Sequence, residues 1–197
     1  NEVLGAGKAE RVARLAAKVD IKVAVDSATA AAELAAAAPA AMQIGVLVDV
    51  NVGLPRCGIA PGEAALELAR RVASTQGLRL RGLMGYEGHA VGIADRKARE
   101  AAAQYAVEQL LSTAQMVREA GLPCDIVSAG GTGTYDITGQ MEGITEIQAG
   151  SYVLMDTAYS QLGIPFELAF SILGTVLSRP SPNICVTDSG HKACTED

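Results

Sequence analysis

Apolar runs of strand length alternate along the chain with segments whose apolar positions recur at helical spacing. A short apolar run is typical of a buried strand, and recurrence at every third or fourth position is typical of an amphipathic helix. The expected strands cover residues 21–25, 45–50, 80–86, 125–129 and 146–155. The expected helices cover residues 28–38, 63–74 and 96–120. This order predicts an α/β fold with parallel strands, either an open doubly wound sheet or a (β/α)8 TIM barrel.

The pattern changes near residue 166. Two further apolar runs, 172–177 and 184–187, are separated by a segment that contains two prolines, 178–183. Short apolar runs around such a segment predict a β-hairpin. We therefore expect part of a (β/α) barrel over residues 1–165 and the start of a β-rich C-terminal domain over residues 166–197.

Composition narrows the function classes. The net charge of −6 disfavours an electrostatic grip on nucleic acid or anionic lipid, so a small molecule is the expected partner. The four cysteines form no CxxC pair, which fits a reducing cytoplasm rather than a disulfide framework. The apolar stretch 28–41 carries Glu33 and reads as a buried helix rather than a membrane span.

Polar residues gather where the expected strands end, which in parallel α/β folds is where functional groups converge. They are Asp26, Ser27, Asp49, Asn51, Arg56, Tyr86, Glu87, His89, the segment 128–134, Gln148 and Ser151. The segment 128–134 contains three glycines and two threonines, a composition that lets backbone amides approach a phosphate. A second segment, with Gly150 and Ser151, is placed to close on the same anion. An ordinary turn without a ligand fits the same residues.

Three single residues have two readings each. Arg56 lies in a loop stiffened by Pro55 and suits a fixed cationic role, although a surface ion pair is equally compatible. Tyr86 can form the flat wall of a pocket or fill the core. His89 is the histidine best placed for acid–base chemistry, with a solvent-exposed or capping histidine as the alternative. For His191, whose spacing to Cys194 suits no common metal site, we predict a structural role.

Taken together, five ordered motifs resemble the D-threonine aldolase family, which belongs to the fold-type III pyridoxal-phosphate (PLP) enzymes with an alanine racemase-like barrel. The motifs cover residues 48–58, 82–89, 128–135, 147–156 and 188–192. The resemblance implies a partial alanine racemase N-terminal barrel. It also implies a PLP-dependent lyase that splits D-threonine and related D-β-hydroxy-amino acids into glycine and an aldehyde.

The resemblance assigns roles residue by residue. Arg56 would bind the phenolic oxygen of PLP, Tyr86 would stack on its ring, and Gln148 replaces an arginine that faces the ring nitrogen in alanine racemases. The implied cofactor-binding residues are Arg56, Tyr86, Ser128, Gly131, Thr132, Gly133, Gln148, Gly150 and Ser151. The implied catalytic residue is His89.

Two parts of the family's machinery are expected outside residues 1–197. The Schiff-base lysine is expected before Asn1, because none of the five lysines ends an expected strand. The ligands of a divalent metal of the manganese, magnesium or zinc type are expected after Asp197, so no metal ligand is assigned within the chain. We therefore expect an internal, by itself inactive, part of a longer cytoplasmic enzyme.

Several alternatives stay open at this point. A D-serine dehydratase or a 3-hydroxy-D-aspartate aldolase of the same fold would differ mainly in the substrate pocket and the metal ligands. Two alternatives involve no catalysis: a PLP-binding barrel protein that is not an enzyme, and a purely structural remnant. A homodimer of the full-length enzyme also stays open.

Overall fold

The computed structural model describes residues 1–39, 42–190 and 192–193. By their contacts these residues form two compact units, one over residues 1–149 and one over residues 150–197. The predicted domain boundary between residues 165 and 166 lies within the second unit, and compactness alone does not test it. Among the described residues, no helix combines the length and the apolar character needed to cross a bilayer.

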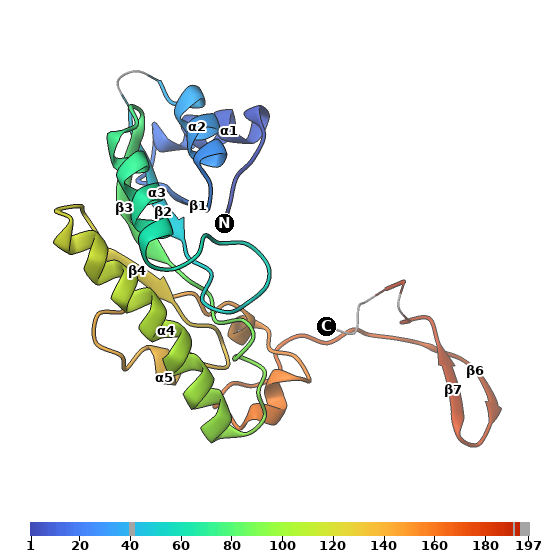
Figure 1. The fold of residues 1–197 in the computed structure, drawn as a ribbon. Helices are drawn as coiled ribbons and strands as arrows, with labels where there is room; N and C mark the ends of the chain where they lie inside the picture. The colour runs from blue at the N-terminus through green and yellow to red at the C-terminus, as the bar shows by residue number, and fades with distance from the viewer. Residues whose placement is uncertain (40–41, 191, 194–197) are drawn as a thin grey trace. The chain divides into compact units, whose positions relative to one another are not determined.

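The first unit is built on a five-stranded, fully parallel sheet (Figure 1). Its strands, in spatial as well as chain order, are β1 Lys22–Val25, β2 Ile44–Asp49, β3 Leu78–Met84, β4 Ile126–Ala129 and β5 Glu146–Ile147. All six residues of β2 are buried, because the strand has a neighbour on each side and helices beside it. Sequential order with parallel pairing is the arrangement of a partial barrel, so the predicted fold class is confirmed.

The chain start continues this sheet on the β1 side. The backbone N–H of Ala24 donates to the carbonyl oxygen of Asn1 at 3.1 Å, and Glu2 pairs with Ala24 in a parallel bridge. Glu2 therefore lies at the same sheet edge as the residues that follow β1 and β2.

Helices connect the strands. They are α1 Ala6–Ala16, α2 Ala28–Ala37, α3 Glu63–Ser74, α4 Arg96–Glu119 and the short α5 Tyr135–Thr138. Ser27 and Asp95 begin α2 and α4, each by accepting a hydrogen bond from a backbone N–H in the first turn. The apolar sides of α2, α3 and α4 contact β1 to β4 and form one core with them.

One predicted strand was too long, and one helix was not predicted. The strand predicted over 146–155 ends after Ile147, because the chain turns at Gly150 into the 3₁₀ helix η1 Ser151–Val153. Helix α1 was missed, although its buried residues Ala9, Val12 and Ala13 recur at helical spacing.

A bulge with a glycine sets the spacing of the central strands. The register between β2 and β3 shifts between Val46 and Leu47, so that Arg81 is the extra residue on β3. The next residue, Gly82, has φ +148°, and a Cβ there would overlap the carbonyl oxygen of Ile126 on β4. Only glycine allows β3 and β4 to approach this closely.

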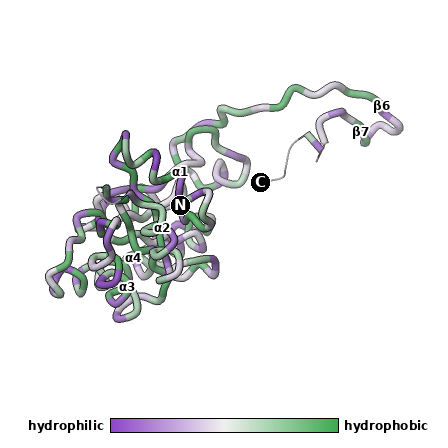
Figure 2. Tube along the Cα trace, turned by 90° about the horizontal axis from the view of Figure 1, so that it is seen from above, coloured by the Kyte–Doolittle hydropathy of each residue, from purple (hydrophilic) through white to green (hydrophobic). Residues whose placement is uncertain are grey.

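The second unit contains η1, a second 3₁₀ helix η2 Tyr159–Leu162, and an antiparallel hairpin of β6 Val176–Ser181 and β7 Ile184–Thr187. The hairpin was predicted, but its first strand lies at 176–181 rather than 172–177, since Ser181 already pairs with Ile184. Apolar residues lie open along this segment (Figure 2), including Val176 and Ile184, which are 59% and 54% exposed.

Candidate functional site

The loops after β2 and β3 bring a cation and an aromatic ring together. The guanidinium carbon of Arg56 lies 5.4 Å from the centre of the Tyr86 ring, a cation–π distance. Arg56 is exposed and Tyr86 is half-buried, so the ring is neither a core residue nor free in solvent. Tyr86 therefore does not fill the core, and its part in a cofactor pocket stays a prediction.

The other neighbour of Tyr86 is the glycine-rich loop after β4. A Cβ added to Gly131 would lie 3.0 Å from Cε2 of Tyr86 and 2.8 Å from a methyl group of Val91. A Cβ added to Gly133 would overlap the carbonyl oxygen of Val91. Glycine at these two positions thus lets the loop pack directly against the segment that contains Tyr86 and Val91.

The loop has a defined internal structure. The backbone N–H of Gly131 donates to Oγ1 of Thr134 at 3.0 Å, and the N–H of Thr134 donates back to the carbonyl of Gly131 at 3.1 Å. Within the described residues, the Gly133 amide is not engaged in any of the loop's hydrogen bonds. Gly131, Thr132 and Gly133 are buried in this unit, so the loop is a fixed cradle rather than a loose turn.

His89 lies beside the loop that carries Arg56. Its imidazole packs against Gly53, where an added Cβ would lie 2.6 Å from Cε1 of His89. Gly53 has φ +131°, and its N–H donates to Oδ1 of Asn51 at 2.9 Å. The side chain of His89 is exposed, so it can exchange protons with a ligand or with solvent.

A hollow of about 420 Å³ opens within the first unit, and two predicted site residues line it. The residues around it are Asn1, Lys22, Val23, Ala24, Leu47, Met84, Ser128, Glu146 and Gln148. Ser128 donates its hydroxyl to Glu146 at 2.6 Å, whereas Nε2 of Gln148 is buried without a hydrogen-bond partner. A buried amide without a partner is costly, and a ligand that accepts from it would remove that cost.

An acidic cluster, Glu2, Asp26, Asp49 and Cys57, lies at the same carboxyl edge of the strands. The thiol of Cys57 donates to Oδ2 of Asp49 at 3.4 Å, and the N–H of Gly58 donates to Oδ2 of Asp26 at 3.2 Å. The ligand-type atoms of Glu2, Asp49 and Cys57 lie within 4.8 Å of one another. At this spacing acidic groups share protons or a cation.

Burial and mutual repulsion shift the acid constants of the cluster. Burial, followed by the charges of Asp26 and Asp49, raises the pKa of Glu2 to about 7. Burial also raises the pKa of Asp49, although the Cys57 thiol and the charge of Arg56 partly offset it. Sequence reasoning noted Asp26 and Asp49 as strand-end residues but missed Glu2 and Cys57. The sequence offered no signal for Glu2, because α1, the helix that follows it, was not predicted.

The remaining predicted residues fall outside this arrangement. Gly150 and Ser151 belong to the second unit, where the N–H groups of Leu154 and Met155 donate to the carbonyl of Ser151. Their part in an anion site stays a prediction. The structural role predicted for His191 falls outside the described residues.

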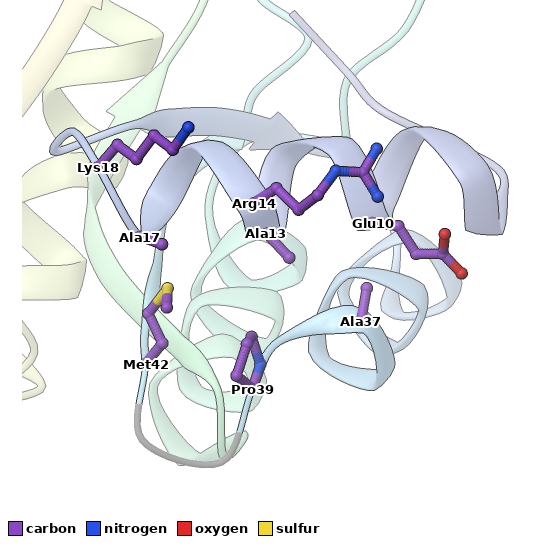
Figure 3. Close-up of a pocket in the computed structure, with 8 residues that line it drawn as sticks. All are labelled: Glu10, Ala13, Arg14, Ala17, Lys18, Ala37, Pro39 and Met42. Atoms are coloured by element: carbon purple, nitrogen blue, oxygen red, sulfur yellow. The ribbon is translucent and has the colours of Figure 1, made fainter.

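A different hollow, of about 440 Å³, lies between α1 and the end of α2 (Figure 3). Its lining residues are Glu10, Ala13, Arg14, Ala17, Lys18, Ala37, Pro39 and Met42. It lies where α1 and α2 lead into the next strands, which places it at the amino ends of the strands. None of the predicted site residues lines it.

Comparison with known proteins identifies the family. The model of the alanine racemase N-terminal domain matches residues 2–158. The chain belongs to the alanine racemase N-terminal domain family. The family resemblance inferred from the motifs is thereby confirmed.

Within this family, the chain is similar to D-hydroxy-amino-acid aldolases. It is 35% identical to a D-threonine aldolase of an Arthrobacter species, over all of this chain and 53% of that protein. It is 33% identical to a 3-hydroxy-D-aspartate aldolase of Paracoccus denitrificans, over all of this chain and 54% of that protein. The crystal structure of a D-threonine aldolase from Filomicrobium marinum superposes with a TM-score of 0.88 at 36% identity, over 98% of this chain and 53% of that one. The chain thus spans about half the length of these relatives.

Proposed function

We propose that this chain is the cofactor-binding part of a PLP-dependent lyase that cleaves D-β-hydroxy-amino acids by a retro-aldol reaction. The observation that supports it best is the contact series from Arg56 to Tyr86 to Gly131, which joins a cation, an aromatic face and a glycine loop at one sheet edge. An alanine racemase-like chain with this series offers separate contacts for an aromatic ring and a phosphate.

The described residues fit PLP in three respects. The buried Nε2 of Gln148 has no partner, and a polar group of a ligand would satisfy it. The loop packs so tightly at Gly131 and Gly133 that a side chain there would displace Tyr86 or Val91. The Gly133 amide has no acceptor among the described residues and is available to an anion.

Under this proposal each group has one task. Arg56 would donate to the phenolic oxygen, Tyr86 would support the ring by stacking, and the loop from Gly131 to Gly133 would hold the phosphate. Gln148 would face the ring nitrogen with a neutral amide, so that nitrogen would have no charged partner. When bound, PLP supplies an electron sink for the pair left on Cα when a bond to Cα breaks.

His89 is the proposed proton acceptor. A nitrogen of its exposed imidazole takes the proton from the β-hydroxyl of the substrate, and the Cα–Cβ bond then breaks to release an aldehyde. The electron pair stays on Cα, which takes up a proton to give glycine. The packing of His89 on Gly53 would keep the imidazole oriented during this transfer.

The names of the similar proteins support a substrate class rather than one substrate. One acts on D-threonine and the other on 3-hydroxy-D-aspartate, and both compounds carry a β-hydroxyl on a D-amino acid. A dehydratase acting on D-serine is the alternative within the same fold, because it needs the same cofactor contacts. The divalent metal stays part of the proposal for the longer protein, with ligands outside residues 1–197.

Product analysis tests the function. The full-length protein, incubated with D-threonine, D-serine and 3-hydroxy-D-aspartate, should release an aldehyde and glycine from at least one of the first and third substrates. Release of ammonia and a keto acid instead would establish the dehydratase. No turnover of any of the three, by protein that binds PLP, would contradict both reactions.

A further inference from the structure

Glu87 is a fully buried acid. The described hydrogen bonds of its side chain all come from the glycine loop after β4 and from α5, the short helix that follows it. Its Oε2 accepts from the N–H of Gly130 at 3.0 Å. Its Oε1 accepts from the hydroxyls of Thr134 at 2.8 Å and Thr138 at 2.6 Å. These partners lie 43 to 51 residues further along the chain, so the side chain ties two loops together.

All three hydrogen bonds are donated to the Glu87 carboxyl group, one by a backbone N–H to Oε2 and two by hydroxyls to Oε1. An amide at position 87 would turn its NH₂ group toward at least one of these donors. Burial of the acid is tolerated because every hydrogen bond is made by a matched donor.

The contacts extend from Glu87 to the predicted phosphate cradle. Thr134, held by Glu87, accepts in turn from the N–H of Gly131. Gly131 packs on the ring of Tyr86, which is the chain neighbour of Glu87. The backbone carbonyl of Glu87 accepts from the N–H of Ala90 at 2.8 Å, and this hydrogen bond closes the turn that contains His89.

We propose that Glu87 is a positioning residue that fixes the loop of residues 130–133 in its phosphate-binding form. The inference rests on the proposed function, since it assigns the phosphate of PLP to that loop. Glu87 does not touch the cofactor. It holds the amides of Gly130 and Gly131 in place, so that the rest of the loop faces the anion without reorganising when it binds.

The test measures the contribution of the phosphate separately from that of the ring. The probes are pyridoxine 5′-phosphate and pyridoxine, which carry an alcohol in place of the aldehyde and so form no Schiff base with surface lysines. We define the phosphate advantage as the dissociation constant of pyridoxine divided by that of pyridoxine 5′-phosphate. Both constants are measured by calorimetry on the whole chain. Hydrogen exchange of the Gly130 and Gly131 amides gives a second readout without any ligand.

Three variants are compared with the wild-type chain. Glu87→Gln removes one acceptor, and Thr138→Val removes one donor at the far end of the contact series. Thr113→Val is the matched control, because Thr113 is also buried and its hydroxyl accepts from the N–H of Gly62 at 2.9 Å, outside the site. The control loses two hydrogen bonds of a buried hydroxyl, from the N–H of Gly62 and to the carbonyl of Gln109, so its melting temperature should fall at least as much.

We expect Glu87→Gln to lower the phosphate advantage by about tenfold, the effect of losing one buried hydrogen bond, with pyridoxine affinity changed by less than about twofold. Amide exchange at Gly130 should accelerate. Thr138→Val should lower the phosphate advantage by a smaller factor. If Glu87→Gln does not fold, this variant decides whether the contacts of Glu87 fix the loop. Thr113→Val should leave both the advantage and the exchange of the loop unchanged.

The outcomes separate the two claims. A wild-type chain that binds both probes equally overturns the phosphate site, and the role of Glu87 in it. A wild-type chain that prefers the phosphate, together with folded Glu87 and Thr138 variants that prefer it equally, overturns the role of Glu87 alone. An equal drop of the advantage in Thr113→Val would also overturn it, because the effect would then be one of general stability.

Discussion

The guanidinium of Arg56 lies 5.4 Å above the ring of Tyr86, although the two residues belong to loops after different strands. The pair forms because β2 and β3 are parallel neighbours and their carboxyl ends meet at one edge. The cation holds one side of the ring and Gly131 contacts its edge, so the orientation of the ring is fixed before any ligand binds.

This geometry predicts that the ring of Tyr86, and not its hydroxyl, contributes to cofactor binding. Tyr86→Ala should weaken the binding of pyridoxine 5′-phosphate by about tenfold, the size of a lost stacking contact. Tyr86→Phe should bind as the wild type does. Tyr105→Ala, which removes a 65% exposed tyrosine on α4, serves as the control. Equal binding by Tyr86→Ala and Tyr86→Phe in a calorimetric titration would refute the stacking role.

His89 is predicted to act in turnover rather than in folding. Its side chain is exposed, so His89→Gln should leave the melting temperature nearly unchanged. In the full-length protein the same variant should lower kcat by about 100-fold with D-threonine, because a positioned general base is lost. Steady-state kinetics across pH check this. Unchanged kcat would remove His89 from the mechanism.

The raised pKa of Glu2 predicts a pH-dependent stability. The folded value of about 7 exceeds the ordinary value of 4.5, so the folded state holds this proton more tightly than the unfolded state. The contribution of Glu2 is therefore most favourable below pH 4.5 and is lost as the pH rises from there to about 7. Because Glu2 is partly open to solvent, we expect a change of only about 1 kcal/mol.

Denaturant unfolding at several pH values measures this effect. Glu2→Gln should flatten the decline of stability with rising pH over that interval, since the neutral amide cannot lose a proton. Part of the slope should remain in this variant, because burial also raises the pKa of Asp49. A variant whose stability falls with pH as steeply as that of the wild type would show that Glu2 titrates normally.

Gly82 is predicted to be essential for the sheet. In Gly82→Ala the new methyl group would overlap the backbone of Ile126, and φ +148° is unfavourable for alanine. We expect a loss of more than about 2 kcal/mol in the free energy of unfolding. Gly92→Ala is the matched control, because a Cβ there meets nothing within 4 Å. Similar melting curves for both variants would contradict the close approach of β3 and β4.

The sequence by itself determined the order of strands and helices, because apolar periodicity is a local property that burial imposes on each element. Helix α3 begins and ends where the pattern predicted, and the glycine-rich loop follows β4, as expected from the predicted strand 125–129. The family was also accessible, since Arg56, Tyr86 and the glycines lie in ordered motifs. The sequence reading missed α1 and made the last strand too long, because β5 stops after two residues.

Only the tertiary structure decided which strand-end residues act together. Glu87 was one polar residue among many in the sequence, and its three partners lie more than 40 positions away. The approach of Glu2 to Asp49, and of His89 to Gly53, likewise depends on sheet order and loop path. Hydrogen bonds and carboxylate repulsion act over a few ångströms in space, whereas periodicity reports only neighbours along the chain.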